Sequence, residues 1–251
     1  GTDFPKKYLK LLESRKIGLS GLEIKSGNTF RWKARYDKDM AHARTLSTEL
    51  NVFEGFRPHI PKEVSREDNL LLANIDPELQ SHIFNRIRPR GIVACDTMNL
   101  WIENRRKELI RLLKKVDIFL LNDEEARQLS GEKNLIKAAE CISSMGAKMI
   151  VIKKGEHGSL FFCDGLSFMS PAYAIKKVSD PTGAGDTFAG GMLGYLTGAK
   201  KIDSGVLRRA LLYGSIMASF AVESFSAAGL LRITAKGLKE RYLRFRGLTV
   251  F

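Results

Sequence analysis

The sequence predicts an α/β fold, in which a parallel sheet is covered by helices on both faces and a small β-rich unit is attached. From residue 70 onward, short apolar segments of strand length alternate with longer segments of helical period, which is typical of parallel sheets. Before that point, residues 20–60 show the polar–apolar alternation of half-buried strands. The length of 251 residues suits one large domain with a small appendage, and a hydrophobic content of 44% is enough for a sizeable core.

A short helix is expected at residues 3–16, before the β-rich unit. Residues 29–36 are expected to form a strand with one aromatic face, because aromatic residues alternate there with basic ones. Residues 46–53 alternate less cleanly and are the expected partner strand. We interpret Trp32 as packing within this unit, with a platform for a sugar as the alternative.

The rest of the chain alternates strands with helices. Strands are expected at residues 70–73, 92–95, 118–121, 149–152 and 159–162, and helices at residues 77–88, 102–114, 124–129, 135–145, 184–196, 204–225 and 234–245. Asn74, Asp96, Asn122 and Lys153 directly follow four successive strands. Because ligands of open α/β sheets bind at the carboxyl ends of the strands, the sequence predicts a ligand site along this edge.

The chain is strongly basic, with 41 Lys and Arg against 28 Asp and Glu and a net charge of +13. Such an excess can bind nucleic acid, or it can attract an anionic ligand such as ATP. The basic residues are scattered over many segments and form no long basic tail. We therefore expect no nucleic-acid partner.

Three cysteines, Cys95, Cys141 and Cys163, lie far apart in the sequence. Their odd number and wide spacing argue against a disulfide framework and a zinc site, and for a reducing compartment. No apolar run approaches the roughly 18 residues that a bilayer-spanning helix needs. We therefore expect a cytoplasmic protein without a membrane partner.

The most informative segment is the glycine loop, residues 180–186, which reads D-P-T-G-A-G-D. It directly precedes a predicted helix, whose first amides lack internal partners and attract phosphate. We predict that the amides of Gly183, Ala184 and Gly185 form an anion hole and that Asp186 is the catalytic base. Amides that hold charge and an acid that takes a proton are what phosphoryl transfer to a hydroxyl requires.

The glycine loop has three other interpretations. A Walker loop requires Lys and then Ser or Thr after its final glycine, and a dinucleotide fingerprint requires glycine where Phe188 stands. The third is a helix cap in which Asp186 only stabilises the first turn. Within the helix, Gly190, Gly194 and Gly198 lie at four-residue spacing, and we expect them to allow close packing.

The glycine loop resembles the C-terminal signature of the ribokinase family, also called PfkB carbohydrate kinases. N-D-E-E at residues 122–125 resembles the family's N-x-x-E motif, and K-K-G-E-H-G at residues 153–158 resembles its nucleotide-side turn. D-T-M-N at residues 96–99 resembles its substrate-side segment. Residues 213–218 fall where the family lines the adenine pocket, although Ser215 replaces the usual Asn.

The resemblance implies a three-layer ribokinase-like core formed by residues 1–19 and 61–251, with residues 20–60 as a small β lid. It implies an ATP-dependent kinase that transfers the γ-phosphoryl group to a hydroxyl of a sugar, polyol or nucleoside. Besides ATP, the implied cofactors are Mg²⁺ and a monovalent cation such as K⁺. The resemblance also implies a homodimer formed through the lid.

The resemblance also assigns roles to single residues. Asn122 and Glu125 organise Mg²⁺, Asp180 belongs to the monovalent-cation loop, the nucleotide contacts are Lys153, Gly155, Gly158, Thr182 and Ser215, and the substrate contacts are Asn74, Asp96 and Asn99. Structural alternatives stay open for several of them. Lys153 can be a solvated strand-end residue, and Glu125 can be a first-turn charge that opposes the helix dipole. Asp96 and Asn99 can be a turn pair.

Family members begin with a strand, an acidic substrate residue and a Gly-Gly loop, and no such segment precedes Gly1. From the size of such domains, we expect about 40 to 60 residues of the family fold to be absent. The alternative function is therefore a nucleotide-binding protein that lacks turnover because its N-terminal substrate segment is missing.

Overall fold

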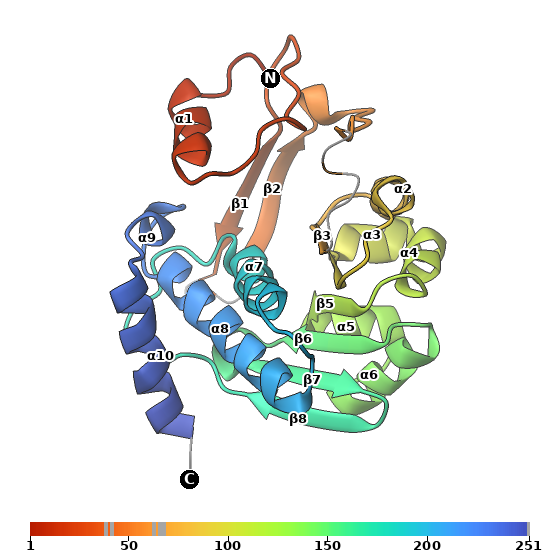
Figure 1. Cartoon of the computed structure of the whole chain (residues 1–251). Helices are drawn as coiled ribbons and strands as arrows, with labels where there is room; N and C mark the ends of the chain where they lie inside the picture. The colour runs from red at the N-terminus through yellow and green to blue at the C-terminus, as the bar shows by residue number, and fades with distance from the viewer. Residues whose placement is uncertain (38–39, 41–42, 62–63, 65–68, 250–251) are drawn as a thin grey trace. The chain divides into compact units, whose positions relative to one another are not determined.

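Figure 1 shows the computed structural model of the chain, which describes residues 1–37, 40, 43–61, 64 and 69–249. The chain divides into two compact units. The N-terminal unit comprises Gly1–Glu67 and His82–Arg88, and the core unit comprises Asp68–Ser81 and Pro89–Phe251. This division groups residues 1–19 with the expected lid, whereas the sequence-based division assigns them to the core.

The N-terminal unit holds a two-stranded antiparallel sheet. Its elements are α1 (Lys6–Ser14), β1 (Arg31–Tyr36), β2 (Ala43–Glu49) and a 3₁₀ turn at Asn51–Phe53. β2 ends earlier than the strand expected at residues 46–53. The reason is Asn51, whose left-handed backbone (φ +50°) does not continue a strand.

The carboxylate of Asp3 joins the start of the chain to β1. It accepts hydrogen bonds from the hydroxyl and the backbone N–H of Thr29, both at 2.6 Å, and pairs with Arg31 at 2.9 Å. These partners, Thr29 foremost, lower the pKa of Asp3 to about 2. This link explains why the start of the chain is part of the N-terminal unit.

The core unit is built on a six-stranded sheet. In spatial order, its strands are β3 (Leu70–Leu72), β4 (Val93–Asp96), β5 (Ile118–Asn122), β6 (Met149–Lys153), β7 (Ser159–Cys163) and β8 (Leu166–Ser170). β3 to β6 run parallel to one another. β7 runs antiparallel to β6, and β8 runs antiparallel to β7, so the sheet is mixed rather than wholly parallel. The turn at residues 154–158 between β6 and β7 is too short for the crossover that a parallel strand needs.

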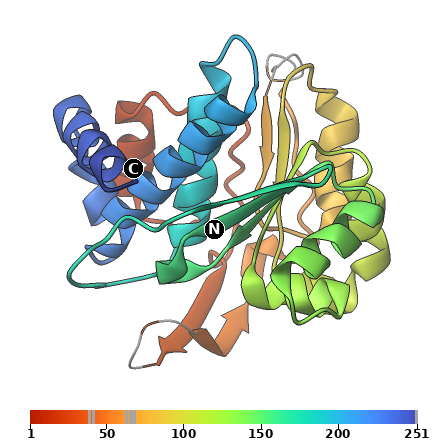
Figure 2. The same ribbon diagram turned by 90° about the horizontal axis from the view of Figure 1, so that it is seen from below.

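Helices cover both faces of this sheet (Figure 2). α5 (Asp123–Ser130) and α6 (Leu135–Ser144) pack on one face, and α7 (Ala184–Thr197) and α8 (Ser204–Val222) pack on the other. Further helices are α2 (Pro77–Ile87), α3 (Asn99–Asn104), α4 (Arg106–Leu113), α9 (Ala228–Leu231) and α10 (Ala235–Thr249). The helix expected at residues 102–114 is divided into α3 and α4 at Arg105.

Alternate strand residues form the apolar core under α7 and α8. Ala94 of β4, Leu120 of β5 and Val151 of β6 pack in one cluster with Phe188 and Met192 of α7. Because successive side chains of a strand point to opposite faces, this register also decides which polar side chains the strand ends present on the α7 face.

The close contact between α7 and α8 is made by other glycines than those we expected. An added Cβ at Gly190 or Gly194 would meet no atom within 4 Å, so the prediction of close packing there is wrong. A Cβ added at Gly191 would stand 2.7 Å from Cγ of Met217 on α8. Gly214 makes the corresponding close approach from α8. Gly191, the neighbour of Gly190, therefore faces α8, and the four-residue spacing of the other glycines does not reveal this.

Among the described residues, α8 is the helix that is long and apolar enough to cross a membrane by composition, with a mean hydropathy of 1.2. Its residues Val206, Ala210 and Leu211 belong to the same buried cluster as the strands. α8 is therefore a core helix of the α/β unit.

Candidate active site

Three side chains at strand ends lie on the α7 face of the sheet. Asp96 ends β4, Asn122 ends β5 and Lys153 ends β6. Each stands two positions after a core residue of that face, so the alternation of the strand turns it to the same side. The structure thus brings three of the predicted site residues to one edge.

Asp96 and Lys153 form a buried ion pair across the end of β5. The Nζ atom of Lys153 donates to Oδ2 of Asp96 at 2.8 Å and to Oδ1 at 3.1 Å. The N–H of Thr97 also donates to Oδ1, at 2.9 Å. The two charged side chains are only 5% and 16% exposed, respectively. Both carboxylate oxygens therefore have internal partners, and a substrate contact by Asp96 stays a prediction.

The glycine loop enters α7 through Gly183, whose left-handed backbone (φ +78°) caps the helix. Glycine adopts this conformation without the steric cost of a side chain. Asp180 holds the loop in place, since its carboxylate accepts the N–H groups of Thr182 at 3.0 Å and of Ser226 at 2.9 Å. Burial opposes the effect of these hydrogen bonds, which nevertheless lower the pKa of Asp180.

The ammonium of Lys153 also lies against the glycine loop. A Cβ atom at Gly185 would stand 3.1 Å from Nζ of Lys153, which is tighter than side chains normally pack. The lack of a side chain at Gly185 therefore leaves room for the ammonium of Lys153. The ends of β4 and β6 and the start of α7 meet around this one charged group.

Asp186 lies in the first turn of α7 and is exposed to solvent. Surrounding protein atoms still desolvate its carboxyl group and raise its pKa, the charge of Asp96 adds to the rise, and Lys153 opposes it. A carboxylate with a raised pKa accepts a proton more readily at neutral pH. The position and the pKa both suit a base, and the catalytic role of Asp186 stays a prediction.

Asn122 and Glu125 form a capping box at the start of α5. The N–H of Glu125 donates to Oδ1 of Asn122 at 2.8 Å, and the N–H of Asn122 donates to Oε2 of Glu125 at 2.7 Å. Glu125 is 6% exposed, and desolvation raises its pKa to about 7. The three-residue spacing of the predicted metal motif is therefore also the spacing of a capping box that stabilises the start of α5.

The charged groups at this edge leave an excess of negative charge. The carboxyl groups of Asp96, Glu125 and Asp186 lie within electrostatic range of one ammonium, that of Lys153. Among the described residues, no group of three His, Cys, Asp or Glu side chains is arranged to hold a metal ion. Mg²⁺ binds through one or two carboxylates, retained waters and substrate phosphates, so the excess charge fits a cation that arrives with a nucleotide.

The other predicted substrate residues lie near the start of α3. Asn99 is its exposed first residue. The side chain of Asn74 accepts a hydrogen bond from Nε1 of Trp101 at 2.9 Å and donates to Sδ of Met98 at 3.2 Å. Trp101 was not expected at the site. The available signal was its position two residues after the D-T-M-N segment.

Several predicted nucleotide contacts have partners within the protein. A Cβ at Gly158 would stand 2.0 Å from the carbonyl oxygen of Ser170, so this turn requires glycine. The hydroxyl of Ser215, which is buried in α8, accepts the N–H of Tyr173 at 2.9 Å. Gly155 starts the same turn as Gly158 with a left-handed backbone. Contacts of these residues with a nucleotide stay predictions.

Gln80 is a supporting residue that the sequence reasoning missed. It is 1% exposed, and its Nε2 atom donates to the carbonyl oxygens of Leu72, Ala73 and Asp96 at 2.9 to 3.1 Å. It therefore ties the end of β3 to the end of β4. The signal was a glutamine directly after Leu79, a buried residue of the same helix.

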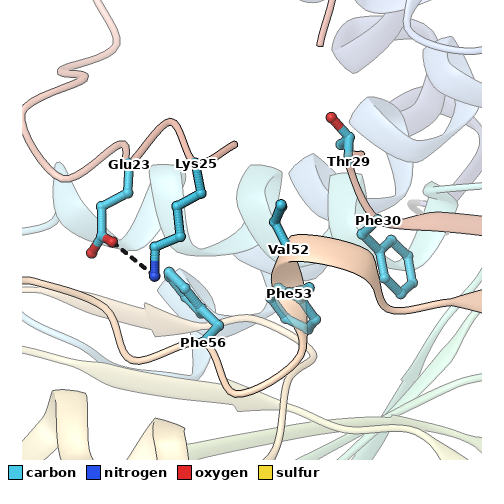
Figure 3. A pocket seen from close by; sticks show the side chains of 7 residues that line it. All are labelled: Glu23, Lys25, Thr29, Phe30, Val52, Phe53 and Phe56. Carbon is cyan, nitrogen blue, oxygen red and sulfur yellow. Dashed lines mark ion pairs between the residues drawn. The ribbon is translucent and has the colours of Figure 1, made fainter. Parts of the chain in front are cut away.

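A pocket of about 140 Å³ lies elsewhere, in the N-terminal unit (Figure 3). Phe53 stacks on Phe56 and meets Phe30 at its edge, and an ion pair joins Lys25 to Glu23 beside them. None of the predicted site residues lines this pocket. The charged edge of the core unit, rather than this apolar pocket, carries the groups suited to phosphoryl transfer.

Comparison with known proteins agrees with the motifs. Residues 1–233 match the family described as pfkB family carbohydrate kinase. The chain is 34% identical over 204 residues to a cytidine kinase of Thermococcus kodakarensis, a match that covers 79% of this chain and 72% of that protein.

Two solved structures share the fold at lower identity. A nucleoside kinase of Methanocaldococcus jannaschii, 21% identical, aligns with a TM-score of 0.73 over 94% of this chain and 76% of its own. A ribokinase of Thermotoga maritima, 24% identical, aligns with a TM-score of 0.72 over 96% of this chain and 78% of its own. The ribokinase-like fold and the resemblance stated from the motifs are confirmed. The chain belongs to the pfkB family of carbohydrate kinases, which are phosphotransferases with an alcohol group as acceptor.

Proposed function

We propose that this chain transfers the γ-phosphoryl group of ATP to a hydroxyl group of a small molecule. Asp186 acts as the base, and the amides of Gly183, Ala184 and Gly185 form the anion hole. The observation that carries the proposal is the convergence of the glycine loop and the ammonium of Lys153 beside Asp186.

The proposed reaction is a direct displacement. The substrate hydroxyl gives its proton to the carboxylate of Asp186 while its oxygen attacks the γ-phosphorus. The bond from the γ-phosphorus to the bridging oxygen of the β-phosphate breaks, and ADP leaves with that oxygen. Charge on the transferred group is stabilised by the amides at the start of α7 and by the positive end of the helix dipole. Of these amides, the N–H of Ala184 also donates to the carbonyl oxygen of Pro181 at 3.1 Å and must turn from it to bind phosphate.

Asn122 and Glu125 are the residues that we propose for Mg²⁺, mainly through its bound water. When it is bound, Mg²⁺ neutralises part of the phosphate charge. The capping box occupies Oδ1 of Asn122 and Oε2 of Glu125, which leaves Oε1 of Glu125 for a water ligand. We also assign Asp180 to a monovalent-cation loop, and a titration of activity with K⁺ tests this role.

For the acceptor we propose a nucleoside or a sugar. Two of the similar proteins are a cytidine kinase and a nucleoside kinase by name. The amide groups of Asn74 and Asn99 offer both donors and acceptors, which suits hydroxyl groups. A cytoplasmic location and a homodimer formed through residues 20–60 remain predictions, and light scattering tests the second.

The test is a coupled assay of ADP release against nucleosides, sugars and polyols, with mass spectrometry of the product. We expect ADP release that depends on one class of hydroxyl compound, and a product that has gained one phosphoryl group. If calorimetry shows ATP binding but no compound supports ADP release, the chain is a nucleotide-binding protein without turnover and the proposal fails.

A further inference from the structure

β6 has a lysine–aspartate ion pair at each end. Lys148, directly before the strand, pairs with Asp117 at 2.8 Å. Lys153, the last residue of the strand, pairs with Asp96 at the same distance. The two pairs differ in burial: the side chains of the first are 64% and 26% exposed, and those of the second are 16% and 5% exposed.

Stability alone does not account for the buried pair. A surface ion pair adds little to the free energy of unfolding. A buried pair must in addition overcome the desolvation of two charges, and apolar residues of similar volume are often equally stabilising. The pair of Lys153 and Asp96 is better explained by the place in which it holds the ammonium.

Asp96 is held both at its carboxylate and at its backbone. The N–H of Thr97 donates to its Oδ1 atom at 2.9 Å. Nε2 of Gln80 donates to its backbone oxygen at 3.0 Å, so the main chain at the end of β4 is held as well. An anchored carboxylate can set the position of the lysine side chain that it binds.

The ammonium of Lys153 has a third direction in which to donate. Two of its three N–H groups suffice for the two oxygens of Asp96, at 2.8 and 3.1 Å. The same nitrogen lies 3.1 Å from the point where a Cβ of Gly185 would stand. One N–H group is therefore available beside the proposed anion hole.

We propose that Asp96 is a positioning residue: it holds the ammonium of Lys153 against the glycine loop, where the third N–H group contacts the phosphoryl group during transfer. This inference rests on the proposed function. Lys153 supplies charge and a hydrogen bond but no proton. In this role Asp96 acts through Lys153 rather than by contact with the phosphoryl group.

The test compares Lys153→Met and Asp96→Asn with the matched control Lys148→Met, which removes the exposed pair on the same strand. We expect Lys153→Met to lower kcat roughly 100-fold or more, the usual loss for one transition-state donor, while the Kd for ADP changes less than tenfold. Asp96→Asn should also lower kcat, because it removes the charge that holds the ammonium of Lys153 in position. Lys148→Met should keep the kcat of the unaltered chain.

The pH profile gives a readout that general structural damage would not produce. Among the described residues, the charge of Asp96 raises the pKa of Asp186 and the charge of Lys153 lowers it. The acid limb of kcat/KM should therefore move to lower pH in Asp96→Asn and to higher pH in Lys153→Met. Should Asp96→Asn fail to fold, Lys153→Arg provides the second measurement, since it keeps the charge and should recover part of the kcat lost in Lys153→Met.

Two results would overturn the inference alone. One is a kcat of Lys153→Met or Asp96→Asn that stays within about threefold of the kcat of the unaltered chain. Such a loss would be much smaller than the loss expected when one transition-state donor is removed. The other is a shift of the acid limb in the same direction in both variants. An unaltered chain that releases no ADP with any hydroxyl compound would instead contradict the proposed function, and this inference would fall with it.

Discussion

Glu125 hydrogen-bonds back to the N–H of Asn122 through a carboxylate that is almost completely buried. The motif expected to organise Mg²⁺ is therefore also the element that starts α5 directly after β5. Its carboxyl group keeps a pKa of about 7, because burial outweighs the hydrogen bond from Asn122 and the charge of Lys153. An acid held in this way makes the stability of the fold depend on pH.

The first prediction concerns Glu125→Gln. In the folded chain Glu125 keeps its proton up to about pH 7, whereas its ordinary pKa is 4.5, so the folded state binds more protons between these values. Stability therefore falls as the pH rises through this window, by at most about 3 kcal/mol. Glutamine can still accept the N–H of Asn122, so Glu125→Gln should be more stable than the unaltered chain at pH 8 and equal to it at pH 4.

Urea unfolding in Mg²⁺-free buffer from pH 4 to 8 measures this difference. The control is Glu140→Gln, which removes an exposed carboxylate on α6 and should leave the pH dependence unchanged. A Glu125→Gln variant that gains no stability at pH 8 would show that burial of this carboxylate is not costly.

The second prediction tests the proposed base. Asp186→Asn should lower kcat by roughly 100- to 10,000-fold, the usual contribution of general base catalysis, and should leave ATP binding nearly unchanged. Asp203→Asn is the matched control, because Asp203 starts the next helix by accepting the N–H of Val206, and asparagine caps a helix equally well. Steady-state kinetics with calorimetric ATP binding decides the matter, and full turnover in Asp186→Asn would remove the residue from this role.

The third prediction compares two adjacent glycines of α7. Gly191→Ala would push a methyl group against Met217, so we expect a loss of about 1 to 3 kcal/mol of unfolding free energy from overpacking. Gly190→Ala points into open space and should gain up to about 1 kcal/mol, because alanine favours the helix. Thermal unfolding of both variants measures the contrast. Equal effects would mean that α7 and α8 are not in close contact at Gly191.

The fourth prediction concerns the entry of the glycine loop into α7. Gly183→Ala meets no atom but must adopt a left-handed backbone, so it should lose about 1 to 2 kcal/mol of stability and part of its kcat. Gly183→Asn is the graded control, since asparagine tolerates this conformation better than alanine. A Gly183→Ala variant as active and stable as the unaltered chain would show that the left-handed cap is not required.

Much of the core unit follows from sequence patterns. Residues 118–121 and 149–152 are continuous apolar runs, and both are buried strands in the structure. The break between α3 and α4 at Arg105 and the strand β8 were missed. Among the described strands, β8 pairs only with β7. Its middle residue Phe168 is buried by that pairing and by α8, so its neighbours rather than its own sequence make it a strand.

The residues of the candidate site also divide into those that the sequence predicts and those that depend on contacts between elements. Residues that act through their own backbone, such as Gly183 in its left-handed cap, can be read from local spacing. Residues whose contacts are made to other elements cannot, and Gln80 of α2 and Trp101 of α3 are examples. The residues next to a position in the sequence do not indicate which distant residues its side chain contacts in the folded protein.

The sequence by itself determined the family, the glycine loop and the polar ends of β4, β5 and β6, because turns, helix starts and strand periods depend on neighbouring residues. Only the tertiary structure decided that Lys153 binds Asp96 and lies against Gly185, since the register of three separate elements brings these residues together. It likewise decided that Gly191 rather than Gly190 meets α8. Long-range contacts depend on how elements pack, and packing is a property of the whole fold.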